Sequence, residues 1–397
     1  MYLQFNLIIY LMKNKSFLLL FFFLFLCQVS FAQQTILNDS NLPIMVISTD
    51  IDPDTNAPTD IPDEPKVLGS MQLIYRPDGS RNYLTDSTNE SFLNYKGRIG
   101  IELRGSSSQA LDKKPYGFTT LLQDGVSNNN VSLLGMPSEN DWVLNSLAYD
   151  PSMVRDYLSY TLASNMGNYA PRVQYIEVIV NGDYKGVYFL TEKVKRDSDR
   201  VNLKKIADDD NDFPDITGGY IIKADKTTGG DEIAWTMPNY GGWDTNFLHH
   251  YPKTEDITSA QANYIETIFY DLADQTNPAN TSIIDGYPSI IDIPSFVDYM
   301  LMAEFASNPD AYQFSTYFHK DRGGKLRAGP IWDYNLSFGN DLFVFGFDRS
   351  FYRVWQFDFE NRGAKFWRDL FQDETFNCYL AKRWFELTGA NQTLNYL

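Results

Sequence analysis

The sequence predicts an α+β fold of two lobes. Apolar and polar residues alternate through most of the first half, as they do in half-buried strands. In the second half, apolar residues recur at the three-to-four-residue spacing of amphipathic helices. These two patterns predict two lobes. Residues 33–195 are expected to form a strand-rich N-terminal lobe that contains one helix, and residues 196–397 to form a mainly helical C-terminal lobe. With 397 residues, 43% of them apolar, the chain can bury a large core.

The charge and the cysteine content exclude several classes of protein. The net charge is −18 at pH 7, whereas binding to a nucleic-acid backbone needs a clustered basic surface. We therefore expect no nucleic-acid partner. Two cysteines and three histidines provide neither a disulfide framework nor a Cys/His zinc pattern.

The first 32 residues predict a secretory signal peptide. Lys13 and Lys15 precede the apolar run "SFLLLFFFLFLC", and Ser30 and Ala32 stand at the −3 and −1 positions of a cleavage site. The run is short for a membrane span. We expect a secreted, periplasmic or cell-surface protein with no transmembrane segment after cleavage.

Strand patterns follow the signal. A first strand is expected at 41–49 and a second at 70–77. The segments 97–105 and 114–122 predict a hairpin with a Ser-rich tip. Between the first two strands, the acidic, Pro-rich segment 50–66 predicts a loop.

Four oxygen-bearing residues alternate in that loop, as calcium ligands do: Asp50, Asp52, Asp54 and Asn56. The loop lacks the glycine and the terminal Glu of an EF-hand. A solvated loop is therefore the favoured interpretation, and "DDDNDFPD" at 208–215 is interpreted in the same way.

A helix and a second hairpin complete the N-terminal lobe. Apolar residues at helical spacing predict a helix that begins at Pro151 and ends at Gly167. In 173–194, two strand patterns flank Asn181-Gly182, and Asn-Gly is the strongest short signal for a hairpin.

The C-terminal lobe contains two predicted helices and a third hairpin. The helix at 259–275 has Ser259 as its expected cap, and the helix at 294–308 is apolar nearly all round, which predicts burial. The hairpin joins 311–320 to 325–334 through the turn "DRGG".

Pairing about that turn places Asp310 and Asp333 nearly opposite each other. Two facing carboxylates repel each other unless a cation lies between them, one is protonated, or both are solvated. Surrounding aromatic residues make an unpaired charge unfavourable here, and Asn335 adds an oxygen ligand on the same face. A metal site is thus one interpretation, and two solvated turn-capping acids are the other. The aromatic residues are Tyr312, Trp332, Tyr334 and Phe338.

Two further segments are candidates for ligand binding. The Ser-rich tip "RGSSSQALDKKPY" at 104–116 offers backbone N–H groups, hydroxyls, Lys113 and Lys114 to a phosphate, although a solvated hairpin tip explains it equally simply. Glu192 ends a strand just before the second lobe. The order of hairpin, helix, two strands and connector is that of a protein kinase.

The chain resembles the CotH kinases, secreted or surface-associated atypical protein kinases named for a spore-coat protein. The resemblance spans about residues 41–390 and depends on several ordered motifs. These are "IELRGSSSQALDKKPYGF" (101–118), "NDWVLNSLAYDPSMVRDYLSYTLASNMG" (140–167), "YIEVIVNGDYKGVYFLTEKVKRDSDRVNL" (175–203), "AEFASNPDAYQFSTYF" (303–318) and "GPIWDYNLSFGN" (329–340).

The resemblance implies a bilobal atypical protein-kinase-like fold that phosphorylates a protein substrate at the cell surface or outside the cell, using ATP and Mg²⁺ or Mn²⁺. It implies that Asp310 is the catalytic acid and that Asp333 binds the metal, with Asn335 beside it. Lys114 is similar to a lysine that binds nucleotide phosphate, with Lys113 as the alternative. Glu192 corresponds to a contact with adenine or ribose. Arg104 and Ser106 of the same loop as Lys114 complete the expected nucleotide site.

Two departures keep other functions open. The stretch after Asp310 offers Gln313 and Ser315 where an ordinary kinase has a metal-binding asparagine. Asn335 substitutes for it, or the site holds one metal, or activity is lost. Relatives often continue past the last helix, so we expect a truncated C-terminal lobe. An extracellular binding or structural module on the same fold is the main alternative, and a hydrolase with Glu304, Asp310 and Asp333 as paired acids is the next.

Overall fold

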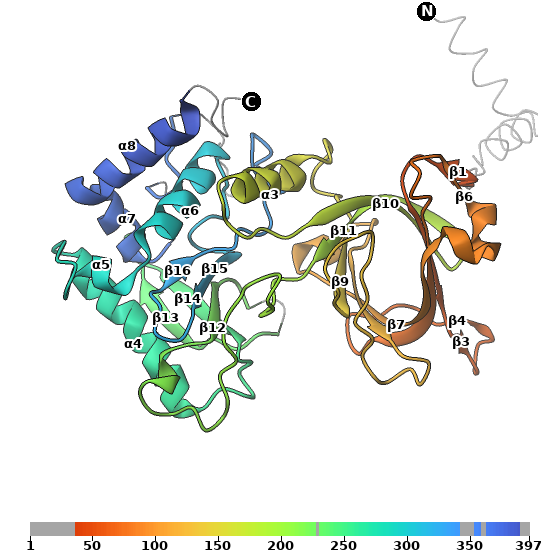
Figure 1. The fold of residues 1–397 in the computed structure, drawn as a ribbon, viewed down its shortest axis with the longest axis horizontal. Coiled ribbons are helices and arrows are strands. Elements are labelled where there is room, and N and C mark those ends of the chain that lie inside the picture. Colours follow the sequence, from red (N-terminus) through yellow and green to blue (C-terminus); the bar gives the residue numbers. More distant parts are fainter. Residues whose placement is uncertain (1–35, 228–229, 342–352, 359–362, 390–397) are drawn as a thin grey trace, which may run out of the picture. The chain divides into compact units, whose positions relative to one another are not determined.

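The structure, a computed structural model, describes residues 36–227, 230–341, 353–358 and 363–389 (Figure 1). The predicted signal peptide at 1–32 lies outside the described residues. Asp39–Leu397 form one compact unit. No helix in the described part of the chain is long and apolar enough to cross a membrane.

A closed barrel of seven strands forms the N-terminal part of this unit (Figure 1). The barrel order is β10-β11-β9-β8-β7-β5-β2, and a parallel pairing of β10 with β2 closes it. Every other pairing in the barrel is antiparallel. The strands are β2 (Ile44–Thr49), β5 (Val67–Ile74), β7 (Leu93–Leu103), β8 (Tyr116–Leu121), β9 (Asp141–Asn145), β10 (Val173–Val180) and β11 (Asp183–Glu192).

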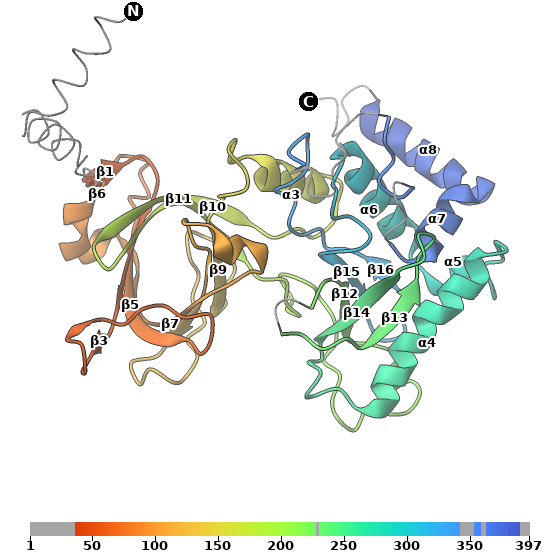
Figure 2. The ribbon, with the colours of Figure 1, turned by 180° about the vertical axis from the view of Figure 1, so that it is seen from behind.

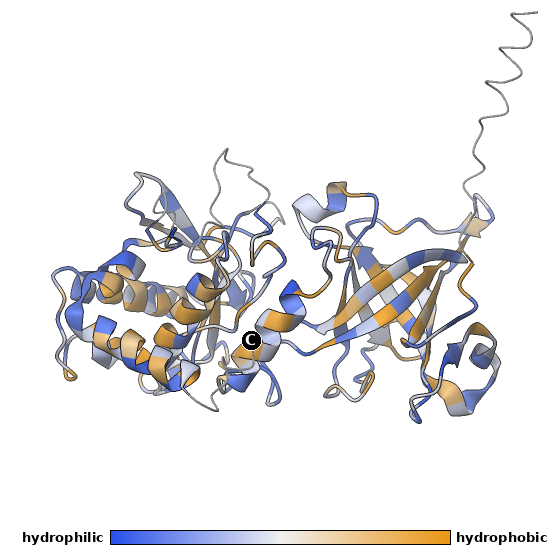
Figure 3. Ribbon diagram, turned by 90° about the horizontal axis from the view of Figure 1, so that it is seen from above, coloured by the Kyte–Doolittle hydropathy of each residue, from blue (hydrophilic) through white to orange (hydrophobic). Residues whose placement is uncertain are grey.

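The barrel confirms both hairpins expected in this region. β7 pairs with β8, and Leu103 lies opposite Tyr116 at the Ser-rich tip. β10 and β11 turn at Asn181 (φ 50°) and Gly182 (φ 79°), the left-handed pair that an Asn-Gly hairpin turn requires. Hydrophobic and hydrophilic residues alternate along the strands (Figure 3), so one face of each strand can fill the barrel interior.

Two local expectations in the barrel region were wrong. β9 was not predicted, yet it pairs with β8 on one side and β11 on the other. The helix α3 (Arg155–Asn165) begins four residues after Pro151, which lies in a turn. Asp150 accounts for the later start, because its carboxylate accepts hydrogen bonds from the main-chain N–H groups of Ser152 and Arg155.

The C-terminal part contains a five-stranded sheet, which corrects the prediction of a bilobal kinase-like fold with a mainly helical C-terminal lobe. The sheet order is β13-β14-β12-β15-β16. The helical prediction failed because β12 is nearly continuously buried, so it shows no apolar–polar alternation. The strands are β12 (Tyr220–Ala224), β13 (Trp235–Pro238), β14 (Asp244–Tyr251), β15 (Thr316–Lys320) and β16 (Arg327–Ala328).

Helices pack against this sheet around one large hydrophobic core (Figure 1, Figure 2). The predicted burial of the second helix is confirmed, since Phe296, Met300 and Ala303 of α6 are fully buried. The expected cap of the first was one residue late, because Thr258 rather than Ser259 caps α4. The helices are α4 (Ser259–Thr276), α5 (Tyr287–Ile290), α6 (Ile293–Phe305), α7 (Lys365–Gln372) and α8 (Glu374–Thr388).

Short elements occupy the connections. The acidic loop 50–66 forms the two-residue strands β3 and β4, with Asp52 accepting hydrogen bonds from the N–H groups of Asp54 and Thr55, and Asp50 paired with Arg98. The remaining elements are β1 (Asp39–Ser40), β3 (Ile51–Asp52), β4 (Ala57–Pro58), β6 (Asn82–Tyr83), η1 (Leu84–Thr88), η2 (Glu90–Phe92), η3 (Ser107–Ala110) and η4 (Asp215–Thr217).

Candidate active site

Asp333 lies in the segment that follows β16. Its backbone adopts φ 60°, a left-handed conformation that Asp tolerates better than most residues. The side chain is half-buried, and its Oδ1 accepts a hydrogen bond of 2.5 Å from Asn335 Nδ2. The two oxygen-bearing side chains expected at the metal site are therefore in direct contact.

Charged groups from two other segments surround Asp333. Burial raises the pKa of Asp333, the positive charges of Arg104 and Lys226 lower it, and the negative charge of Asp225 raises it. Arg104 comes from the loop after β7, and its guanidinium carbon lies 5.7 Å from the ring centroid of Trp332. Asp225 and Lys226 directly follow β12. The barrel and the second sheet thus each place a cation near this carboxylate.

A second buried carboxylate, Asp156 of α3, was not predicted. It is 1% exposed, and its Oδ1 accepts a hydrogen bond of 2.7 Å from Tyr334 N. Burial and then the charge of Asp333 raise the pKa of Asp156. The sequence shows only that Asp156 and Tyr160 are four residues apart and so share one helix face. Their contacts with the Asp333 segment are tertiary, so the sequence does not reveal them.

Asp310 lies in the turn after α6, and the β15–β16 ladder does not bring it to Asp333. The ladder pairs Phe318 with Ala328 and His319 with Arg327, and neither acid belongs to it. Asp310 N donates to Asn308 Oδ1 at 3.2 Å, and its carbonyl accepts from Phe314 N at 2.9 Å.

Lys226 borders both acidic segments. Its Nζ lies 5.6 Å from the ring centroid of Phe314, four residues after Asp310, and its charge acts on Asp333. The stretch after Asp310 offers Gln313 where an ordinary kinase has a metal-binding asparagine, and this side chain bonds within its own turn. Gln313 is buried and its Nε2 donates to Pro309 O at 3.2 Å.

The two lysines of the Ser-rich loop are held within the barrel region. Lys114 Nζ donates to Gln109 O at 2.7 Å, and Lys113 Nζ donates to Val187 O at 2.5 Å. Ser106 precedes η3, where its carbonyl accepts from Gln109 N. Arg104 is the loop residue whose charge reaches Asp333.

Glu192 is fully buried in an ion-pair network at the end of β11. Its carboxylate lies 2.8 Å from Arg172 Nη1 and 3.3 Å from Arg200 Nη2. It also accepts from Arg172 N and Tyr169 OH. These contacts are typical of a structural carboxylate.

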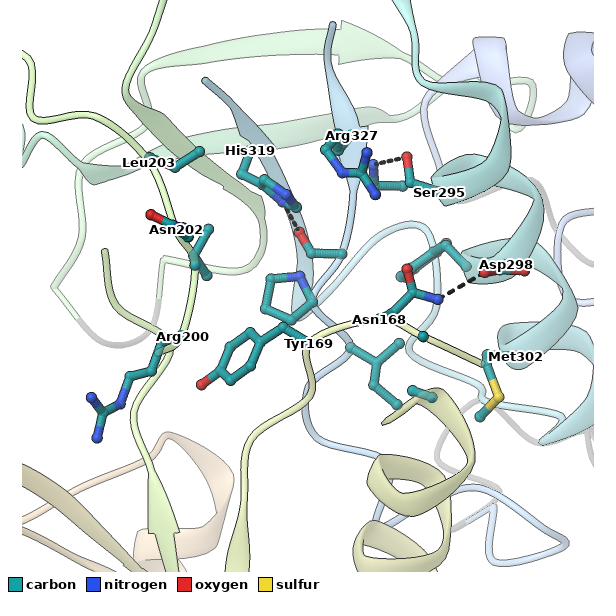
Figure 4. Close-up of a pocket in the computed structure, with 18 of the residues that line it drawn as sticks. Asn168, Tyr169, Arg200, Asn202, Leu203, Ser295, Asp298, Met302, His319 and Arg327 are labelled. Atoms are coloured by element: carbon teal, nitrogen blue, oxygen red, sulfur yellow. Dashed lines mark hydrogen bonds between the residues drawn. The ribbon is translucent and has the colours of Figure 1, made fainter. Parts of the chain in front are cut away.

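A pocket of about 370 Å³ lies beside this network, lined by the end of α3, the 200–203 connector, α6 and the β15–β16 region (Figure 4). The guanidinium of Arg200 points away from it, and Asn168 bonds to Asp298 within its wall. Neither Asp333 nor Glu192 lines the pocket. The Asp333 cluster, by which we mean Asp333, Asn335, Arg104 and Lys226, does not line this pocket.

Glu304 does not form a pair with the other acids. It accepts hydrogen bonds from Tyr312 OH at 2.7 Å, Gln356 N at 2.7 Å and Phe357 N at 3.0 Å. Burial raises its pKa to about 7. Because three donors already bond to this carboxyl group, its role is structural: it joins the Tyr312 side chain and the main chain at 356–357 to α6.

The Asp333 cluster suits a hard cation that shares its ligands with a phosphate. In the part of the chain that the structure describes, no three His, Cys, Asp or Glu side chains converge as a metal cage. Magnesium commonly takes only one or two protein carboxylates and completes its coordination with water and substrate phosphates. Asp333 and Asn335 provide such a partial set of oxygen donors beside two cations.

Comparison with protein families agrees with the motifs. The family model described as CotH kinase protein matches residues 101–391. The chain belongs to the CotH kinase family. The match extends from within β7 to just past α8, so it includes Arg104, Asp156 and Asp333. No curated protein matches the chain.

Proposed function

We propose that this CotH family member is an exported kinase that transfers the γ-phosphate of ATP to a hydroxyl group of a protein at the cell surface or outside the cell. The observation that carries the proposal is that the positive charges of Arg104 and Lys226, from two different parts of the fold, both act on Asp333. Phosphoryl transfer depends mostly on positioning and charge neutralisation, which is what such a cluster provides.

The residues of the Asp333 cluster, and Asp310 outside it, have separate roles in this proposal. Asp333 and Asn335 hold Mg²⁺ or Mn²⁺, which when bound neutralises charge on the phosphate oxygens. Arg104 and Lys226 bind phosphate oxygens directly. Asp310 orients the acceptor hydroxyl and accepts its proton.

Ligand-induced stabilisation and phosphate transfer test these roles separately. ATP with Mg²⁺ or Mn²⁺ should raise the unfolding temperature of the wild type by a few degrees, because a ligand that binds only the folded state stabilises it. Asp333→Ala should abolish this shift. Asp310→Ala should keep it but lose transfer of labelled γ-phosphate to a mixture of surface proteins.

The exposed Asp285 provides a matched control, since Asp285→Asn removes a charge from the surface. It should behave as the wild type in both assays. Failure of ATP with either cation to stabilise the wild type would overturn the proposal. Stabilisation without any transfer would favour a nucleotide-binding module in place of a kinase.

A further inference from the structure

The first two turns of α3 hold the segment that carries Asp333. Three side chains of this helix form hydrogen bonds with main-chain groups of the segment. These bonds therefore do not depend on which side chains the segment carries. The bonds run from Arg155 Nε to Ser337 O (2.8 Å), from Tyr334 N to Asp156 Oδ1 (2.7 Å) and from Asp333 N to Tyr160 OH (3.2 Å).

The segment requires such support. Asp333 has φ 60°, and a non-glycine residue persists in the left-handed region only when its surroundings hold it there. The β15–β16 ladder ends at Ala328, five residues earlier, so sheet hydrogen bonds do not fix this backbone. The contacts with α3 are available for that task.

Asp156 also connects the segment to the barrel. Its Oδ2 accepts from Asn145 Nδ2, at the end of β9, at 3.4 Å. The turn just before its helix is joined to β10 by the bond from Tyr175 OH to Met153 O. One carboxylate therefore touches a barrel strand and the main chain beside the metal-binding acid.

We infer that Asp156 is a positioning residue that fixes the backbone at Asp333 and Tyr334 and thereby sets the affinity of Asp333 for the divalent cation. The inference rests on the proposed function. Residues that orient a metal ligand commonly change metal affinity by about 10- to 100-fold when they are removed. Asp156 would act in this way through the peptide N–H next to the ligand.

The test uses the full chain with Mn²⁺ and a non-hydrolysable ATP analogue. Mn²⁺ affinity is measured by electron paramagnetic resonance, and exchange of the Tyr334 amide by hydrogen–deuterium exchange. Asp156→Ala should weaken Mn²⁺ binding by about tenfold or more and speed exchange at Tyr334. Asp156→Asn retains an oxygen that can accept from Tyr334 N, so it should lose less of both.

Asp298 provides the matched control. It is a buried acid on α6 that pairs with Arg383 and accepts from Asn168, and neither partner belongs to the Asp333 segment. Asp298→Asn should destabilise the protein while leaving Mn²⁺ affinity and Tyr334 exchange unchanged.

The outcomes separate the two proposals. Wild-type Mn²⁺ affinity in Asp156→Ala, together with lost binding in Asp333→Ala, would overturn the inference and leave the proposed function standing. Equal weakening in Asp156→Ala and Asp298→Asn would overturn it too, because both effects would then come from general destabilisation. A wild type that binds no Mn²⁺–nucleotide would overturn both.

Discussion

Glu192 and Asp333 are both acids at the exit of a hairpin, and both were predicted to contact nucleotide or metal. Glu192 is fully buried, and two arginines with two further donors surround its carboxylate. Asp333 is half-buried and accepts a side-chain hydrogen bond from Asn335, while Arg104 and Lys226 act on it through their charges.

The difference shows how a chain separates structural from functional carboxylates. A buried charge is stable only when it is paired. Two arginines lie within ion-pair distance of the Glu192 carboxylate, whereas Arg104 and Lys226 act on Asp333 through their charges. Substitution of either acid tests whether its role is structural or functional.

The largest expected effect is at Glu192. Glu192→Ala should lower the free energy of unfolding by about 4 kcal/mol, because it leaves the buried Arg200 without its closest carboxylate. Urea denaturation measures the loss. The exposed pair of Glu90 and Lys96 is the control, and Glu90→Ala should change stability little. If Glu192→Ala changed the free energy of unfolding only slightly, Glu192 would not be a structural carboxylate.

Glu304 is an intermediate case, held by hydrogen-bond donors without an ion pair. Its pKa is about 7 when folded, against an ordinary value of 4.5. Between these pH values the folded chain keeps a proton that the unfolded chain releases, so stability should fall as pH rises. The loss is up to about 3 kcal/mol. Urea unfolding at pH 5 and pH 8 should show it, and Glu304→Gln should reduce this pH dependence. An equal dependence of unfolding free energy on pH in the wild type and in Glu304→Gln would contradict this explanation.

Asp333 should show the opposite behaviour to Glu192. Asp333→Asn should change the stability of the ligand-free protein by no more than about 1 kcal/mol. Burial raises the pKa of this half-buried carboxyl group, so its charge contributes little to stability. The variant should also lose the stabilisation by ATP and Mg²⁺. For the wild type this stabilisation is about 2.7 kcal/mol when the ligand concentration is 100 times its dissociation constant. Strong destabilisation without ligand would show that Asp333, like Glu192, is structural.

The smallest effect compares two basic residues of the Ser-rich loop. Arg104→Ala should raise the KM for ATP about tenfold, equivalent to about 1.4 kcal/mol, because its charge acts on Asp333 at the proposed nucleotide site. Lys114→Ala should raise it less, since its ammonium group is bonded to Gln109 O. Steady-state kinetics distinguishes them. The reverse order would restore Lys114 as the phosphate lysine.

Much of the fold followed from local patterns. The Asn181-Gly182 hairpin, the β7–β8 hairpin and the buried helix α6 were predicted, because turn chemistry and apolar periodicity act over a few residues. β9 and the strands β12, β13 and β14 of the second sheet were missed, whereas the β15–β16 hairpin was predicted. A short strand buried on both faces gives no alternation and cannot be told from other apolar segments.

Local sequence patterns were enough to identify the family and the β7–β8 and β10–β11 hairpins, and to place Asp333 and Asn335 two residues apart. Only the tertiary structure decided that β2 closes the barrel on β10, that Arg200 neutralises Glu192 and that Asp156 reaches Tyr334. The physical reason is distance along the chain. Asp156 and Tyr334 are 178 residues apart. No local propensity encodes such a contact, because it forms only when separate elements pack together.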